Sequence, residues 1–303
     1  MLYINKDQKK TEGNNLTEEY LQNECRATDG HFSGIHYSDT AQNSHDSFSS
    51  LSNYKQRMVD VIMDNQSRYC CYCLRKINGA QIKTLEHIIP QSVTSANITT
   101  LNYYQRIPEL SPTMVMPTDA FESQTNQRRP PYPHEVSYNN MVASCDGTFP
   151  DILSSKGNPS GCCCNNKRGN DKAFPIYYLS NVNELIEYTK EGEIHAVIGT
   201  PWSQEADDLI SSTNLNHDSL RLIRKMWFKL RLLDFSEICQ GNADKEKRRV
   251  LLYKALYPDN PKDYTILKME EATRLSQKFE DDSQWETFML YHQFYYIMKR
   301  LYP

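Results

Sequence analysis

The sequence of 303 residues predicts an α+β protein, in which a small β element carrying histidine and cysteine is embedded in a mainly α-helical chain. Three observations predict this class. A strand-like run ends near His87 and lies between two clusters of cysteines. Apolar residues recur at helical spacing between Ser52 and Gln66. The same periodicity returns from about Asp207 to the end of the sequence.

The first 51 residues differ in composition from those that follow. Residues 1–51 are rich in Asn, Ser, Thr, Asp and His and hold few apolar anchors, which predicts an extended polar arm. The helix predicted over 52–66 comes next, because Tyr54, Met58 and Ile62 are spaced by one helical turn. It leads directly into the first cysteine cluster.

Two insertions interrupt the middle of the chain. Residues 93–138 contain six prolines, at 108, 112, 117, 130, 131 and 133, so we expect no long helix or strand there. Segments of this length within a compact domain usually carry function or are disordered. Residues 146–161 form a shorter insertion rich in glycine and proline.

The last part of the chain, 176–303, is predicted to be a small β element followed by helices. The predicted strands are Phe174–Leu179 and Ile194–Ile198, with a strand or short helix over Val182–Thr189 and a turn at Glu191-Gly192. The predicted helices are one capped by Asn216 or Asp218 and running through Leu233, one over Lys245–Leu256 and one over Ser283–Leu301.

The cysteines favour metal binding over disulfides. No apolar run approaches the roughly 20 residues that span a bilayer, and the start lacks the features of a secretory signal, so we expect a cytoplasmic protein without membrane association. In that compartment clustered cysteines are more often metal ligands. Seven of the nine cysteines fall in two patches, and only Cys25 and Cys239 stand apart.

The spacing of the clustered cysteines predicts a structural zinc site. Cys70-x-x-Cys73 is a zinc-knuckle spacing, and thiolates are favoured ligands of tetrahedral zinc. The second half is less regular, since Cys145 is separated from a run of three cysteines at 162–164. We therefore expect Zn²⁺ to be bound by Cys70, Cys73, Cys145 and one member of that run.

Between the two clusters lies a pair of residues suited to catalysis. In Leu85-Glu86-His87-Ile88-Ile89-Pro90-Gln91-Ser92 a carboxylate and an imidazole are adjacent at the end of the predicted strand. A histidine that titrates near neutrality can act as a general base. A carboxylate oxygen suits Mg²⁺ or Mn²⁺. The pair therefore predicts metal-assisted cleavage of a phosphodiester bond.

Three stretches together resemble the motif of the HNH nucleases, a family built on a ββα-metal finger with a zinc ribbon in many members. The stretches are Glu86–Ser92, Asn140–Cys145 and Cys164–Gly169. The resemblance implies that residues 52–175 form an HNH nuclease domain with insertions. It also favours Cys164 as the fourth zinc ligand, over the spare Cys162 and Cys163; Cys71 is spare as well.

The resemblance also implies a role for each residue of the catalytic site. His87 would be the general base, Asn140 would orient it, and Glu86 with Asn165 would bind the catalytic Mg²⁺ or Mn²⁺. Lys167 or Arg168 would contact the adjacent phosphate. Alternatives for the two asparagines are Asn139, Asn166 and Asn170.

A weaker resemblance extends beyond the motif. Thr213–Leu220, followed by Arg221 and Arg224, is similar to the region after the HNH motif in the nuclease subunits of Septu-type anti-phage systems, which act with an ATPase. The charge agrees with a partner, because residues 60–175 hold 11 Lys and Arg against 10 Asp and Glu. A nuclease that finds DNA unaided usually has a basic face. We therefore expect an ATPase subunit to deliver the nucleic acid.

Three functions are compatible with these features. The first is a DNA endonuclease that acts as the effector of an anti-phage system. The second is an HNH-type toxin that cleaves RNA, such as tRNA. The third is a zinc-ribbon adaptor that binds a partner without catalysis. The presence of Glu86, His87, Asn140 and Asn165 together favours a nuclease over an adaptor.

Overall fold

The computed structural model describes residues 1–27, 47–78, 83–111, 113–122, 129–149, 161–169, 171–240, 245–256 and 266–303. Within these ranges the regular structure is mostly helical, and the strands form three two-stranded sheets, which confirms the α+β class. None of the described helices combines the length and the apolar character that crossing a bilayer requires.

The strand that ends at His87 pairs with the strand that ends at Cys145. Strands β1 (Lys83–His87) and β4 (Met141–Cys145) are antiparallel, with Glu86 opposite Val142 and His87 opposite Met141. Every residue of β4 is buried, which agrees with its apolar and small side chains. Helix α6 (Cys164–Arg168) packs against β4, so two strands and a short helix meet at one place.

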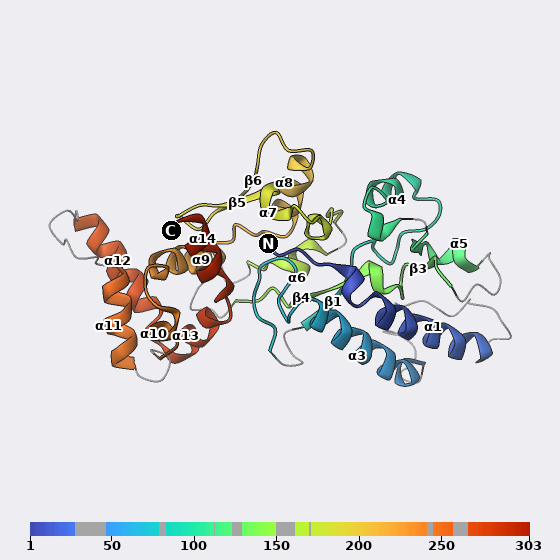
Figure 1. Ribbon diagram of the computed structural model, residues 1–303, viewed down its shortest axis with the longest axis horizontal. Coiled ribbons are helices and arrows are strands. Elements are labelled where there is room, and N and C mark those ends of the chain that lie inside the picture. Colours follow the sequence, from blue (N-terminus) through green and yellow to red (C-terminus); the bar gives the residue numbers. More distant parts are fainter. Residues whose placement is uncertain are drawn as a thin grey trace.

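The N-terminal region is not extended where the structure describes it. Helix α1 (Lys10–Ala27) packs along helix α3 (Ser47–Asn65), as Figure 1 shows, and η1 (Lys6–Gln8) precedes them. The prediction of an extended arm was wrong for residues 10–27 because a few apolar residues suffice for one helix face: Leu16 is buried, and Tyr20 stacks on Tyr54 at 4.8 Å. Residues 28–46 lie outside the described ranges.

In its described residues, the insertion 93–138 contains only short elements, as predicted. They are α4 (Ile98–Tyr104), η2 (Pro108–Leu110), β2 (Val115–Met116), α5 (Thr118–Glu122), β3 (Tyr132–Pro133) and the start of η3 (Tyr138–Asn140). Strands β2 and β3 are parallel. The insertion is nevertheless folded onto the domain, since Leu101, Tyr104 and Phe121 are buried in the common core. Most of the second insertion, 150–160, lies outside the described ranges.

The segment after α6 differs from the prediction in one element. Residues 176–178 form the 3₁₀ helix η5 (Ile176–Tyr178), not part of a strand, because Pro175 has no N–H for a ladder and the three side chains are all buried. The short-helix alternative holds at α7 (Val182–Leu185), which leads into the antiparallel strands β5 (Ile186–Tyr188) and β6 (Ile194–Ala196).

Helices form the rest of the chain. They are α8 (Ser203–Ser212), α9 (Asp218–Leu230), α10 (Phe235–Gln240), α11 (Lys245–Leu256), α12 (Ile266–Lys278), α13 (Asp282–Met289) and α14 (Gln293–Leu301). The predicted single helix over 283–301 is two, because the Leu290 carbonyl accepts from the N–H of Lys76 at 2.8 Å and the helical ladder is interrupted there.

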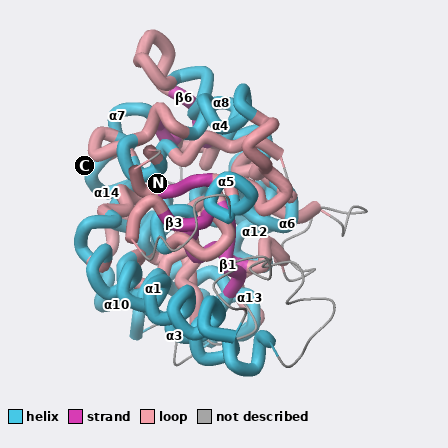
Figure 2. The backbone as a smooth tube through the Cα atoms, turned by 90° about the vertical axis from the view of Figure 1, so that its right-hand side faces the viewer, coloured by secondary structure: helices cyan, strands magenta, loops and turns pink. Residues whose placement is uncertain are grey.

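The elements are arranged so that the β1–β4 pair lies between two helical regions. In Figure 1, α1 and α3 lie on one side of β1, β4 and α6, and helices α9 to α14 lie on the other. Figure 2, in which strands are magenta, places β1 and β3 near the centre of the view with helices around them. Of these helices, α3 packs directly against β4.

Candidate functional site

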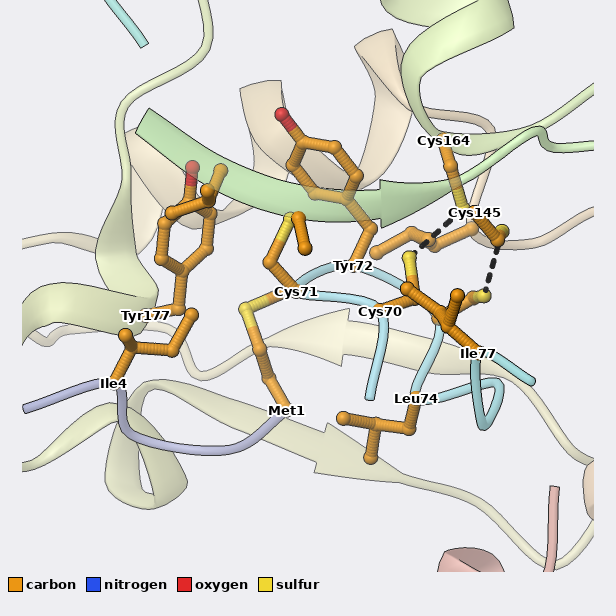
Figure 3. Close-up of a cluster of buried hydrophobic side chains, with 14 of the residues drawn as sticks. Met1, Ile4, Cys70, Cys71, Tyr72, Leu74, Ile77, Cys145, Cys164 and Tyr177 are labelled. Carbon is orange, nitrogen blue, oxygen red and sulfur yellow. Dashed lines mark hydrogen bonds between the residues drawn. The ribbon is translucent and has the colours of Figure 1, made fainter. Parts of the chain in front are cut away.

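Four cysteines form one buried cluster. The Sγ atoms of Cys70, Cys73, Cys145 and Cys164 all lie within 4.8 Å of one another. The Cys70–Cys164 and Cys73–Cys145 Sγ distances are 3.8 and 3.6 Å. In Figure 3 the sulfurs of Cys70, Cys145 and Cys164 lie close together, whereas Cys71 lies apart. Tetrahedral thiolates about 2.3 Å from zinc are separated by about 3.8 Å. The four thiols therefore fit a zinc ion, which confirms the predicted group and selects Cys164 as its fourth member.

Backbone hydrogen bonds bring the two halves of the cluster together. The knuckle turns at Leu74, whose N–H donates to the Cys70 carbonyl at 3.2 Å with a φ of 62°. The N–H of Cys71 donates to Ala143 in β4 at 3.1 Å. The Cys164 N–H donates to the Thr213 carbonyl at 2.9 Å, so the first residue of the segment Thr213–Leu220 holds the second half of the cluster.

A close backbone contact supports the irregular second half. The N–H of Cys163 donates to the Gly147 carbonyl at 3.0 Å. Gly147 has a φ of 69°, and a Cβ there would lie 1.9 Å from the Cys163 carbonyl oxygen, so only glycine fits. The Cys163 Sγ lies 3.3 Å from that of Cys164, which makes it a neighbour of the cluster.

The thiols influence one another's protonation. Burial alone would raise every thiol pKa, and it does so for Cys71 and Cys164. The pKa of Cys70 instead lies well below its usual range, because its hydrogen bonds with the neighbouring thiols, Cys145 and Cys164 first, outweigh the effect of burial. The pKa values of Cys73, Cys145 and Cys164 are raised, so without metal the cluster favours a thiolate at Cys70 alone, and zinc binding would release the protons of the other three thiols.

His87 is held by hydrogen bonds at both ring nitrogens. Its Nε2 lies 2.8 Å from the backbone carbonyl of Glu135, which can only accept, so Nε2 carries the proton. Nδ1 is then the acceptor, and the side-chain amide of Gln91 lies 3.1 Å from it. Burial lowers the pKa of His87 to about 4, so the imidazole is neutral at pH 7.

Asn140 joins the end of β1 to the insertion by hydrogen bonds. Its side-chain oxygen accepts from the Ile89 N–H at 2.7 Å, and its amide donates to the carbonyls of Ile89 at 3.0 Å and His134 at 2.7 Å. Its backbone carbonyl accepts from the N–H of Ile88 at 2.9 Å. Three of these hydrogen bonds fix the chain directly after His87, the position in which an orienting residue is expected, and the fourth joins Asn140 to His134.

Glu86 and Arg168 form a buried ion pair. The Arg168 guanidinium donates to the Glu86 carboxylate, and also to the carbonyls of His87 at 3.0 Å and Ile88 at 2.8 Å. The hydroxyl of Tyr72 donates to the same carboxylate oxygen, Oε1, at 3.3 Å. Arg168 is thus directed into the chain at the strand end, which differs from the predicted phosphate contact. Lys167 is exposed.

A cavity of about 550 Å³ opens beside this pair. Glu86, His87 and Asn165 all line it, so the structure brings these three predicted residues to one space. Asn166 instead donates to the Asp146 carbonyl, and Asn139 accepts at its carbonyl from Tyr178, so neither alternative matches the predicted geometry as well. Asn170 lies outside the described ranges.

Most of the remaining lining of the cavity comes from residues to which the sequence alone assigned no role. They belong to the segment after His87 and to the insertion: Gln91, Ser92, Val93, Thr94, Thr118, Asp119, His134 and Glu135. Gln91 and Ser92 end the stretch that resembles the HNH motif, and for the other six residues the sequence signal was the length of the insertion. The insertion is therefore part of the site.

Comparison of the chain with protein-family models, with curated proteins and with solved structures finds no match. The functional assignment therefore depends on the residues and geometry of the site.

Proposed function

We propose that this protein is a metal-dependent HNH-type endonuclease that hydrolyses phosphodiester bonds, with DNA as its substrate. One observation carries the proposal. Glu86, His87 and Asn165 line a single cavity beside a buried cluster of four cysteines. The elements at the site are the paired strands β1 and β4 and the short helix α6; with the elements of the insertion left out, they follow in the strand, strand, helix order of the finger that the sequence resembles.

His87 is suited to act as the general base. The imidazole is neutral near pH 7, and its proton is on Nε2, held by the Glu135 carbonyl. Nδ1 therefore faces a donor, and the amide of Gln91 occupies that position at 3.1 Å. This amide orients the imidazole before substrate enters; a water molecule that then takes its place at Nδ1 can give its proton to His87 and attack phosphorus.

The oxygen atoms of Glu86 and Asn165 would hold the catalytic ion. Tyr72 and Arg168 both contact Oε1 of Glu86, so Oε2 is the oxygen suited to an ion in the cavity. Mg²⁺ or Mn²⁺ bound there would act as a Lewis acid on the scissile phosphate and its leaving oxygen. The four cysteines, with structural Zn²⁺, would hold β4 and α6 in register.

The charge distribution supports an ATPase partner. The segment 60–175 is nearly neutral, with 11 basic and 10 acidic residues. Three of these acidic residues, Glu86, Asp119 and Glu135, line the cavity, and no lysine or arginine of the described residues does. Such a surface attracts a polyanion poorly. Delivery of DNA by an ATPase subunit in an anti-phage complex accounts for this charge.

One observation favours the adaptor as a second candidate. The Glu86 carboxylate is already neutralised by Arg168. In a non-catalytic zinc ribbon this ion pair would be a permanent part of the fold, and no metal would enter the cavity. Cleavage assays separate the two functions.

The proposal is tested by incubating the purified chain, alone and with its co-purified partner, with plasmid DNA, single-stranded DNA and total RNA. We expect DNA cleavage that requires Mg²⁺ or Mn²⁺, stops with EDTA and is lost in His87→Ala at unchanged zinc content. Cleavage of RNA alone would favour the toxin. Absence of cleavage under every condition would favour the adaptor.

A further inference from the structure

We propose that His134, a residue of the insertion, is a positioning residue that sets the orientation of His87 through Gln91. The inference rests on the proposed function for its catalytic meaning, but its structural part stands on hydrogen bonds alone. His134 lies in the insertion 93–138, and neither its spacing nor its neighbours in the sequence indicate a role.

His134 is buried, and each of its polar groups has a partner. Its backbone N–H donates to the Met116 carbonyl at 2.7 Å, and its carbonyl accepts from Asn140 at 2.7 Å. Its ring Nδ1 accepts from the backbone N–H of Thr118 at 3.2 Å. Because a backbone N–H can only donate, Nδ1 is unprotonated and Nε2 carries the ring proton.

The protonated nitrogen points to the segment after the catalytic histidine. His134 Nε2 lies 3.3 Å from the backbone carbonyl of Gln91, and the Gln91 side chain reaches His87 Nδ1 at 3.1 Å. The next residue, Glu135, accepts from His87 Nε2 at 2.8 Å. Two hydrogen bonds thus join residues 134–135 to residues 87–91, and together they enclose the imidazole of His87.

These two hydrogen bonds account for the way the insertion contributes to the site. Glu135 determines which nitrogen of His87 is protonated, and His134 fixes the backbone from which Gln91 reaches the other nitrogen. The two hydrogen bonds of the His134 imidazole therefore have different roles. The bond to Gln91 acts on His87, and the bond to Thr118 only secures the start of α5.

Two substitutions separate these bonds. In His134→Gln the side-chain amide nitrogen, Nε2, lies about as far from the backbone as the Nε2 of histidine, so the donor to the Gln91 carbonyl is kept. In His134→Asn the side-chain oxygen replaces Nδ1, so only the acceptor for Thr118 is kept. Melting temperature and zinc content verify that both variants fold.

The first readout is the ¹⁵N spectrum of the histidine rings without substrate, which does not depend on nuclease activity. We expect His87 to show the Nε2–H tautomer in the wild type and in His134→Gln, and altered ring signals in His134→Asn. If His134→Asn does not fold, Gln91→Ala removes the other end of the path and must alter the His87 Nδ1 signal. Unchanged His87 signals in His134→Asn, or in Gln91→Ala where that variant replaces it, would overturn the inference.

The second readout is kinetic. Misplacement of a catalytic group lowers the rate of the chemical step more than substrate binding. We expect kcat to fall about tenfold or more in His134→Asn with KM for DNA unchanged, and to be restored in His134→Gln. Equal losses in both variants would show that His134 serves only the fold. If the wild type cuts no nucleic acid, the nuclease proposal fails and the ring spectra alone decide the positioning role.

Discussion

Replacing the buried amide of Asn140 tests the geometry of the site most simply. In Asn140→Ala three hydrogen bonds are lost: one from the Ile89 N–H and two to the carbonyls of Ile89 and His134. Asn140 is fully buried, so these backbone groups cannot all recover partners in water. We expect a large loss of stability from a small truncation.

The magnitude follows from the hydrogen bonds. Each contributes about 1 kcal/mol net, and a buried group left without a partner costs about 1–3 kcal/mol. The free energy of unfolding should therefore fall by about 3 kcal/mol or more. With a urea slope of about 3 kcal/mol per molar, the unfolding midpoint shifts by about 1 M.

The assay is urea unfolding of the zinc-loaded protein, monitored by circular dichroism. Asn139→Ala is the matched control, because the hydrogen bond of Asn139 to the described residues is made by its backbone carbonyl, which accepts from the Tyr178 hydroxyl. The same atoms are removed from an adjacent buried residue, 2% exposed, with that bond kept. If Asn140→Ala were no less stable than Asn139→Ala, the role assigned to the Asn140 amide would be refuted.

Three further predictions concern the metal cluster, the buried ion pair and pH. Cys164→Ser should abolish stoichiometric zinc binding, measured by mass spectrometry of the metal, whereas Cys163→Ser should keep it; equal zinc loss would contradict the ligand assignment. Arg168→Gln should cost about 3–5 kcal/mol in urea unfolding, because a buried Glu86 charge is left unpaired, and a cost below about 1 kcal/mol would contradict that pairing. The pKa of His87 is lowered to about 4 from 6.5, so the unfolded chain binds the proton first and stability falls as pH drops from about 6.5 to about 4. Between pH 7.5 and 5 the wild type should lose about 2 kcal/mol more than His87→Gln, in which acid effects on the thiols are the same; parallel losses would contradict the pKa shift.

The parts of the site that could be predicted from sequence are those set by short-range spacing. Cys70 and Cys73 are brought together by a single turn, and Glu86 and His87 are adjacent at a strand end. The second half of the cysteine cluster could not be predicted from spacing, because Cys145 and Cys164 meet only through the pairing of β4 with β1 and the packing of α6. The resemblance supplied that register.

The parts that could not be predicted depend on contacts distant in sequence. His134 is 47 positions beyond His87, and only the fold of the insertion brings its neighbour Glu135 to the imidazole. Arg168 resembled a phosphate ligand in the sequence, yet three acceptors at the end of β1 draw its guanidinium inward. Residues 10–27 appeared too polar to fold, but burial of Leu16 against the core stabilises α1.

The most direct test of the nuclease proposal is the rate of DNA cleavage by wild type and His87→Ala, compared at equal zinc content in the presence of the partner and Mg²⁺ or Mn²⁺. Loss of a general base typically costs about 10²–10⁴ in rate. We predict a decrease in that range with DNA binding retained. Equal cleavage rates would show that His87 is not the base and would contradict the proposed function.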